Sequence, residues 1–204
     1  MAVLSPRDEA AWHRLGGRVA PVIEQRLQPG VLANRSTESA TAWSLAPVPA
    51  SIRLANRVAA GVAGRSSLLL RTDVASFYGS VTPPVLAECL RSSGADPVDA
   101  RLSADMLEEW GSEGYEGLPI GPPASAVMAN AVLRPVDEAL SPTPILRWVD
   151  DYLIGLPSAG GMLVVLDRID EALGRVGLRR SERKTSVVEG PTALRWPGDD
   201  GSSA

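Results

Sequence analysis

Two adjacent carboxylates, Asp150 and Asp151, occupy the middle of the segment Ile145–Gly155, which is apolar on both sides of the pair. This pattern predicts a strand, a tight acidic turn and a second strand. Neighbouring like charges repel each other unless water or a cation screens them. A hairpin tip that holds both carboxylates toward a cleft therefore suits a hard cation such as Mg²⁺, although Asp is also common in solvated turns.

A third carboxylate, Asp73, lies near the end of a buried type of strand that is predicted over residues 68–74. From this strand onward the predicted order is strand, helices, strand, strand, helix and strand. That order is typical of an α+β fold with a split βαβ arrangement, in which an antiparallel sheet carries helices on one face. The first strand can then lie beside the hairpin, so that Asp73 faces Asp150 and Asp151 in the outline of a two-metal site.

Apolar spacing, capping residues and loop-forming residues indicate the other elements. Helices are predicted at 5–28, 49–63, 82–94, 97–110, 124–140 and 161–176. Irregular loops are predicted at 29–46 and 111–123, and a last strand at 184–189.

The composition indicates a folded protein with an acidic balance. Its 204 residues, 45% of them hydrophobic, are enough for one domain with a sizeable core. The net charge of -4 is unfavourable for binding nucleic acid, because phosphate contacts need positive side chains. A basic cluster near the C-terminal end, which includes the single lysine of the chain, is the exception: Arg175, Arg179, Arg180, Arg183 and Lys184.

The single cysteine, Cys89, and the single histidine, His13, exclude several classes of protein. They leave no disulfide framework and no Cys/His zinc cluster within one chain. His13 lies in an N-terminal helical pattern with no nucleophile motif near it, which argues against a His-dependent triad. No signal peptide and no apolar run of roughly 20 residues is present, so the expected location is the cytoplasm, away from membranes.

Four segments agree in chain order and in predicted structural context. They are Thr72–Val81, Gly117–Ser125 with Asn130 on the next helix, Arg147–Asp151, and Gly177–Thr185. This series resembles the palm of reverse transcriptases, specifically bacterial ones, over about residues 66–190. Phe77 with Tyr78 and the run Leu118–Pro122 are most similar to abortive-infection and other phage-defence reverse transcriptases.

The resemblance implies a division of the chain. Its parts are a helical N-terminal region or partial fingers at 1–65, a reverse transcriptase palm domain at 66–190 and a flexible tail at 191–204. The arginines before the palm (Arg35, Arg53 and Arg57) do not align with triphosphate-binding residues of the family. About twenty residues follow Lys184, which leaves no room for the helical thumb that normally grips the duplex.

The resemblance also implies a set of catalytic and metal-binding residues. Asp73, Asp150 and Asp151 would bind two Mg²⁺ ions, for which Mn²⁺ can substitute, and Asp151 would lie closer to the primer end. Val74 would offer its backbone carbonyl to a cation beside the nucleotide. Lys184 would approach the leaving pyrophosphate. Two cations that bridge attacking and leaving oxygens suit nucleotidyl transfer, and they need no histidine.

Nucleotide contacts are implied for two further segments. Tyr78 matches the aromatic position that stacks under the sugar and clashes with a ribose 2′-hydroxyl. Leu118, Pro119 and Gly121 match the loop that lies against template and incoming dNTP. Ile120 stands where many relatives carry Gln, which removes a side-chain contact and bears on template dependence. Trp148 replaces the usual Tyr, so an aromatic platform is kept and a hydroxyl is lost.

Each of these residues also has a purely structural interpretation. Asp73 can cap the turn after its strand, and Tyr78 can belong to the core. The segment Gly117–Pro123 can be a lead-in to the next helix, and Lys184 can be a solvated surface residue.

Three functions remain open from the sequence. The first is an RNA-directed DNA polymerase that takes an RNA template, a DNA primer and dNTPs, with phage defence as a possible setting. The second is a template-independent DNA nucleotidyltransferase. The third is a palm kept as a scaffold that binds RNA or a partner, against which the three acids argue. A nucleotide cyclase is disfavoured because its Gly-Gly-Asp-Glu-Phe-type signature is absent.

The missing thumb predicts weak grip on a duplex. Phosphate contacts supply most of the affinity for nucleic acid, and this chain is acidic. A thumb-like partner protein, a structured RNA or self-association is expected to act as the clamp. It would cover apolar surface near Val187, Val188 and Trp196.

Overall fold

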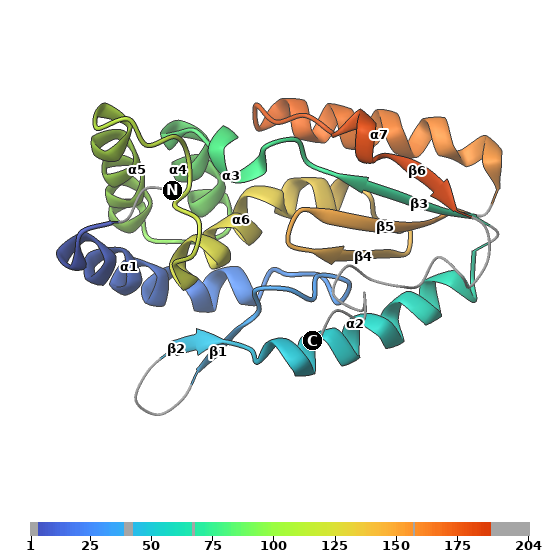
Figure 1. Cartoon of the computed structure of the whole chain (residues 1–204), viewed down its shortest axis with the longest axis horizontal. Coiled ribbons are helices and arrows are strands. Elements are labelled where there is room, and N and C mark those ends of the chain that lie inside the picture. Colours follow the sequence, from blue (N-terminus) through green and yellow to red (C-terminus); the bar gives the residue numbers. More distant parts are fainter. Residues whose placement is uncertain (1–3, 39–42, 67, 157, 189–204) are drawn as a thin grey trace, which may run out of the picture.

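Helices surround a small antiparallel sheet in this computed structural model, which describes residues 4–38, 43–66, 68–156 and 158–188 (Figure 1). The elements in chain order are α1 (Pro6–Glu24), β1 (Ser36–Glu38), β2 (Trp43–Leu45), α2 (Val48–Ala63), β3 (Leu68–Asp73), α3 (Phe77–Ser80), α4 (Pro83–Ser92), α5 (Pro97–Ser112), α6 (Pro123–Ala139), β4 (Ile145–Trp148), β5 (Asp151–Leu156), α7 (Met162–Arg175) and β6 (Ser186–Val188). Two short 3₁₀ turns, Ala159–Gly161 and Glu182–Lys184, precede α7 and β6.

The main sheet has the strand order β4-β5-β3-β6, and every neighbouring pair is antiparallel. The first strand of the palm-like segment, β3, therefore lies beside the hairpin β4–β5, as the sequence predicts. The register places Asp73 opposite Asp151, and Trp148 is opposite Asp151 on the other side. The acidic turn thus lies at the end of the sheet where β3 ends.

The two faces of the sheet pack against different helices. Because side chains alternate along a strand, Leu70 and Ile154 belong to the large core that α6 and α7 complete. Leu69 and Leu153 point the other way, into a smaller cluster that includes Ala59 of α2. Figure 1 shows α2 and α7 on opposite sides of the strands. The predicted one-sided helical cover holds for α6 and α7, while α2, from the N-terminal region, packs on the opposite face.

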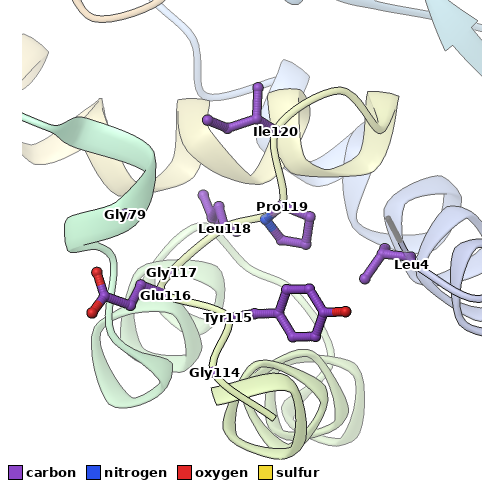
Figure 2. A pocket seen from close by; sticks show the side chains of 9 residues that line it. All are labelled: Leu4, Gly79, Gly114, Tyr115, Glu116, Gly117, Leu118, Pro119 and Ile120. Carbon is purple, nitrogen blue, oxygen red and sulfur yellow. The ribbon is translucent and has the colours of Figure 1, made fainter. Parts of the chain in front are cut away.

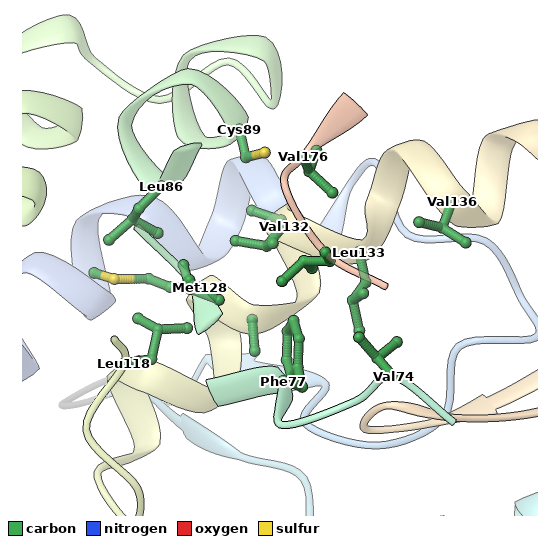
Figure 3. Packing of buried hydrophobic residues seen from close by; sticks show 14 of the residues in the cluster. Val74, Phe77, Leu86, Cys89, Leu118, Met128, Val132, Leu133, Val136 and Val176 are labelled. Carbon is green, nitrogen blue, oxygen red and sulfur yellow. The ribbon is translucent and has the colours of Figure 1, made fainter. Parts of the chain in front are cut away.

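Helix α1 shares the large core with α5 and α6 (Figure 3 shows part of this core). Ser5 caps α1 by accepting a hydrogen bond from the Asp8 backbone N–H. Trp12 is fully buried, donates its indole N–H to Ser125 Oγ at 2.9 Å and packs edge-on against Trp110. Within the described part of the chain, no helix has the length and hydropathy needed to cross a membrane.

Three details differ from the sequence-based prediction. The predicted loop 29–46 contains the short hairpin β1–β2, which the backbone N–H of Ser36 ties to Glu24 of α1 at 3.0 Å. The one-turn helix α3 was not predicted. The last strand begins at Ser186, because the preceding residues form a 3₁₀ turn. Strands of three residues carry too little periodicity to be detected, and long-range contacts hold them in place.

Candidate active site

Three carboxylates from two distant segments meet at the end of the sheet. Asp73 is buried, whereas Asp150 and Asp151 are half-buried. Burial first, and then the charges of Asp73 and Asp151, raise the pKa of Asp150 to about 6. Burial and the charge of Asp73 also raise the pKa of Asp151. The acids therefore lie close enough to repel one another, which favours uptake of a cation at this end of the sheet.

Lys184 contacts this acidic group, and the charge of Arg71 also acts on Asp151. Its Nζ lies 2.8 Å from Asp73 Oδ2, and this hydrogen bond raises the pKa of Lys184. The lysine side chain is 55% exposed while that of Asp73 is 6% exposed, so the ammonium group reaches the buried acid from solvent. Such an exposed group can move away from Asp73 when another cation arrives.

The segment that carries Lys184 is fastened along the end of β3. The backbone N–H of Ser181 donates to the Asp73 carbonyl at 2.7 Å, and the Thr72 and Thr185 hydroxyls lie 2.8 Å apart. Val74 is buried and forms an isolated bridge with Arg180. These contacts place the lysine segment and the first acidic segment together, although more than a hundred residues separate them in the chain.

Carboxylate oxygens suit Mg²⁺, and the arrangement fits a site that substrate completes. Among the described residues, no three His, Cys, Asp or Glu side chains form a ready-made metal group. Mg²⁺ is typically held by one or two carboxylates together with waters and substrate phosphates. Asp73, Asp150 and Asp151 would supply the protein oxygens, and the remaining positions would be open to phosphate and water.

The acidic turn is held in an unusual backbone conformation. Val149, which precedes Asp150, has a φ of 59°, a left-handed value that β-branched residues rarely adopt. Such a conformation costs about 1–2 kcal/mol. The guanidinium of Arg147 donates to the Val149 carbonyl at 2.7 Å, and a hydrogen bond from a charged donor contributes about 1.5–3 kcal/mol. The buried guanidinium of Arg147 therefore stabilises the strained conformation of the acidic turn.

Sequence reasoning did not assign a role to this buried support. Arg147 and Asp137 form a bidentate ion pair, with both nitrogen-to-oxygen distances 2.8 Å, and each side chain is almost completely buried. Asn130, Asp137 and Arg147 each interrupt an apolar segment at an inward position. A charged residue within the apolar run before an acidic turn is the signal that could have indicated them.

Tyr78 lies beside the acids and is half-buried. Its ring packs edge-on against Phe77 at 5.2 Å between centroids. Burial, and then the charge of Asp150, raise the pKa of Tyr78 to about 12, while a hydrogen bond with the Asn34 side chain lowers it. Tyr78 is therefore in contact with the core and also within electrostatic reach of the acidic turn.

The glycine-rich loop before α6 is pinned to Tyr78. The Leu118 backbone N–H donates to the Tyr78 carbonyl at 2.8 Å. Gly117 has a φ of 67°, and a Cβ there would lie 2.0 Å from the same carbonyl oxygen. Only glycine allows this approach, so the loop and Tyr78 are held together by backbone contact.

The predicted nucleotide-binding residues of this loop divide into two kinds. The Leu118 side chain is 1% exposed and belongs to the core (Figure 3), and its N–H bonds to Tyr78, so a nucleotide contact by Leu118 stays a prediction. Pro119 is half-buried, Gly121 has a φ of 116° and Ile120 is 63% exposed. Figure 2 shows a pocket of about 320 Å³ between this loop, Tyr115 and Gly79.

Comparisons with known proteins identify the family of the chain and solved structures with a similar fold. Residues 17–198 match the family model described as reverse transcriptase (RNA-dependent DNA polymerase). The match begins within α1, so the N-terminal helices lie inside the family region. No curated protein matches the sequence.

Among solved structures, telomerase from Candida albicans, in complex with a TWJ fragment of telomeric RNA, has a similar fold with a TM-score of 0.53 and 15% sequence identity. The similarity covers 85% of this chain and 34% of that telomerase chain. The chain therefore corresponds to about a third of that telomerase, and the likeness concerns the fold.

Proposed function

Because the chain belongs to the reverse transcriptase (RNA-dependent DNA polymerase) family, we propose that it extends a DNA primer with dNTPs on an RNA template. The observation that carries this proposal is the meeting of Asp73, Asp150 and Asp151 at the end of the sheet, where burial and the neighbouring carboxylates raise the pKa of Asp150. Repulsion between carboxylates destabilises the fold, so three converging acids are expected where they serve a function.

The three acids would hold two Mg²⁺ ions, or Mn²⁺ in their place, which when bound supply charge stabilisation to the attacking and leaving oxygens. Asp73 and Asp150 provide the shared carboxylates, and Asp151 lies on the primer side. The backbone carbonyl of Val74 adds one more oxygen. Lys184 leaves Asp73 and turns to the pyrophosphate end of the nucleotide, where its positive charge favours departure of the leaving group.

Tyr78 and the adjoining loop would contact the sugar and base of the incoming nucleotide and select for dNTPs. The half-buried ring of Tyr78 lies where it can exclude a 2′-hydroxyl, which is a repulsive device for choosing dNTPs. Half-buried Pro119 and exposed Gly121 would contribute the loop surface that lies against the nucleotide. The backbone hydrogen bond between Leu118 and Tyr78 keeps the two surfaces in register.

A template-independent nucleotidyltransferase is the second candidate, and one observation favours it. Ile120, at the tip of the loop, is 63% exposed and apolar. A polar side chain there would hydrogen-bond a template or nucleotide, whereas isoleucine can make only van der Waals contacts. The scaffold alternative is weaker, because a scaffold would not need converging carboxylates.

A duplex clamp from outside the described residues completes the proposal. Val187 on β6 is 42% exposed, while the side chain of Val188 and Trp196 lie outside the described residues. We propose that a thumb-like partner protein, a structured RNA or a second copy covers this edge. Phage defence is the proposed setting, supported by the sequence of Phe77, Tyr78 and the loop that follows Gly117.

Primer extension by purified protein tests these proposals. A DNA primer, either annealed to an RNA template or alone, is incubated with each dNTP singly and with all four, in Mg²⁺ or Mn²⁺. Product that copies the template supports the first function, and untemplated additions support the second. Asp73→Asn serves as the inactive variant, and Asp105→Asn, on the exposed face of α5, is its matched control. Equal extension by wild type and Asp73→Asn would refute the assignment.

A further inference from the structure

Arg147 is the hub of a fully buried polar network beneath the acidic turn. Its guanidinium donates four hydrogen bonds, two of which go to the Asp137 carboxylate at 2.8 Å each. The nitrogen Nη1 donates both to Asn130 Oδ1 at 3.0 Å and to the Val149 carbonyl at 2.7 Å. Asp137 also accepts from the Tyr152 hydroxyl at 3.1 Å. The network therefore joins α6 and β5 to the turn.

We propose that Arg147 is a positioning residue, which holds the acidic turn in the conformation that binds a divalent cation and links that turn to the Tyr78 side of the site. This inference rests on the proposed function. It assigns to Arg147 a role in shaping the cation-binding turn, which differs from stabilising the fold.

The strained turn is the first argument. Val149 adopts a left-handed backbone conformation that its branched side chain disfavours. The peptide between Val149 and Asp150 is planar, so fixing the Val149 carbonyl also fixes the direction of the Asp150 N–H and the position of the Asp150 Cα. Without the bond from Arg147, the turn would relax toward a more ordinary conformation and Asp150 would move.

The chemistry of the side chain is the second argument. A guanidinium presents its donors in a rigid planar fork, which lets one group bind a carboxylate in bidentate fashion and reach a carbonyl on its other side. A lysine at the same position keeps the positive charge beside Asp137 but is a single point of contact. It cannot also hold Asn130 and Val149.

The backbone of Arg147 provides the third argument, because it anchors the loop before β1. Its N–H donates to the Gly30 carbonyl at 2.8 Å, and its carbonyl accepts from the Leu32 N–H at 3.0 Å. A Cβ on Gly30 would lie 2.2 Å from the Ile145 carbonyl oxygen. The loop can therefore lie along β4 only because residue 30 is glycine.

Asn130 extends the link from the guanidinium to Tyr78. Its amide donates to the carbonyls of Ala33 at 3.3 Å and Asn34 at 3.1 Å. Asn34 is in turn close enough to Tyr78 to lower the pKa of its hydroxyl. One buried guanidinium thus contacts the acidic turn directly, and Asn130 connects it to the segment that carries Asn34, next to Tyr78.

A purely structural role is the competing explanation, because Arg147 also neutralises the buried Asp137. The two roles differ in how Val149→Gly acts. Glycine adopts the left-handed conformation without strain, so it relieves the need for the bond to the carbonyl. It does nothing for an imperfectly paired Asp137.

The experiment compares wild type, Arg147→Lys, Val149→Gly and the double variant. Mn²⁺ binding is followed by electron paramagnetic resonance, and thermal unfolding is measured on the same samples. Extension of oligo(dT) on poly(rA) with dTTP gives the Mg²⁺ concentration for half-maximal rate. Arg134→Lys is the matched control, since Arg134 is also a buried arginine, but it lies on α6 and bonds to Ser92, Ser93 and Glu138.

Arg147→Lys is expected to weaken Mn²⁺ binding and raise the Mg²⁺ requirement by about 10-fold. The double variant regains most of that loss while its melting temperature stays at the level of Arg147→Lys. Arg134→Lys lowers the melting temperature and leaves Mn²⁺ binding unchanged. Wild-type Mn²⁺ affinity in Arg147→Lys, absence of rescue in the double variant, or no Mn²⁺ binding by wild type would each overturn the proposal.

A replacement variant and a comparison of binding with activity complete the experiment. If Arg147→Lys does not fold, Asn130→Ala replaces it; this variant removes a neutral partner of the same Nη1 and is expected to weaken Mn²⁺ binding several-fold, with rescue by Val149→Gly. Failure of that weakening or rescue counts against the proposal. A wild type that binds Mn²⁺ but extends no primer refutes the proposed function, while the Mn²⁺ measurements still judge the role of Arg147.

Discussion

Lys184 Nζ lies 2.8 Å from Asp73 Oδ2, although 111 residues separate these two residues in the chain. The contact gives Asp73, the most buried of the three acids, a positive partner. If Asp73 binds a divalent cation as we propose, that cation competes with the ammonium group of a lysine side chain that is more than half exposed.

Lys184→Met should bind Mn²⁺ several-fold more tightly than wild type, because no ammonium competes for Asp73. The same variant should extend primers at least about 10-fold more slowly, since the charge near the leaving group is lost. Mn²⁺ titration and single-turnover extension measure the two effects. Arg183→Met, at the exposed neighbouring position, is the control, and an unchanged Mn²⁺ affinity in Lys184→Met would contradict the competition.

Asp150→Asn should lose extension by at least about 10³-fold and yet raise the stability of the metal-free protein. The folded pKa of Asp150 is about 6, above the value of about 3.9 in unfolded chains. The folded state therefore binds more protons between these values, and wild-type stability falls as pH rises through that window. After allowance for solvent screening, the gain in Asp150→Asn is about 1 kcal/mol at pH 8.

Thermal unfolding without metal at pH 8 and pH 5 checks this sign. The melting temperature of Asp150→Asn should exceed that of wild type by about 2–4 °C at pH 8, and the difference should shrink at pH 5. Asp105→Asn, whose carboxylate is on the surface, should show no such trend. A variant that is less stable than wild type at pH 8 would mean that Asp150 has a stabilising partner.

Tyr78→Ala should increase use of rNTPs relative to dNTPs by about 10-fold, since removal of the ring removes a clash worth about 1.4 kcal/mol or more. Because the ring also packs against Phe77, some loss of stability should accompany the change. Competition between dTTP and UTP on one template measures the ratio. Tyr115→Ala, which alters the neighbouring pocket, should leave the ratio unchanged, and equal ratios in both variants would assign Tyr78 to the core alone.

Gly117→Ala should destabilise the protein by about 2 kcal/mol or more, because its Cβ would lie 2.0 Å from the Tyr78 carbonyl oxygen. Gly114→Ala is a matched control: its φ of 92° is also left-handed, but nothing lies within 4 Å of the added Cβ. Denaturant unfolding of both variants separates the clash from the backbone strain. Equal losses in the two would show that the loop does not depend on close contact with Tyr78.

Binding of primer-template should be weak and steeply dependent on salt. The chain has a net charge of -4, which opposes binding to phosphates, so any phosphate contacts depend on locally clustered basic residues such as those around Lys184. Fluorescence anisotropy at low and moderate salt should show at least about a 10-fold loss of affinity. Long processive synthesis in moderate salt by a protein that sedimentation shows to be monomeric would refute the need for an external clamp.

The sequence by itself determined the local features of the site. Alternating apolar residues and an acidic turn predict the hairpin that carries Asp150 and Asp151, and a buried strand predicts the position of Asp73. These features depend on residue spacing and turn chemistry, which are local properties, so they can be predicted without knowledge of the fold. The order of the motifs was likewise enough to indicate the family that the comparison confirmed.

The tertiary structure decided which side chains from distant segments meet. The register of β3 and β5 sets Asp73 opposite Asp151, as the sequence predicted, whereas only the packing of α6 brings Asp137 beneath Arg147. It also buried the Leu118 side chain in the core, which the loop sequence does not indicate. Such contacts join residues far apart in the chain, and a buried ion pair leaves no periodic trace in the sequence. The reason is physical: burial and pairing arise from how elements pack, whereas sequence patterns record mainly how each element forms.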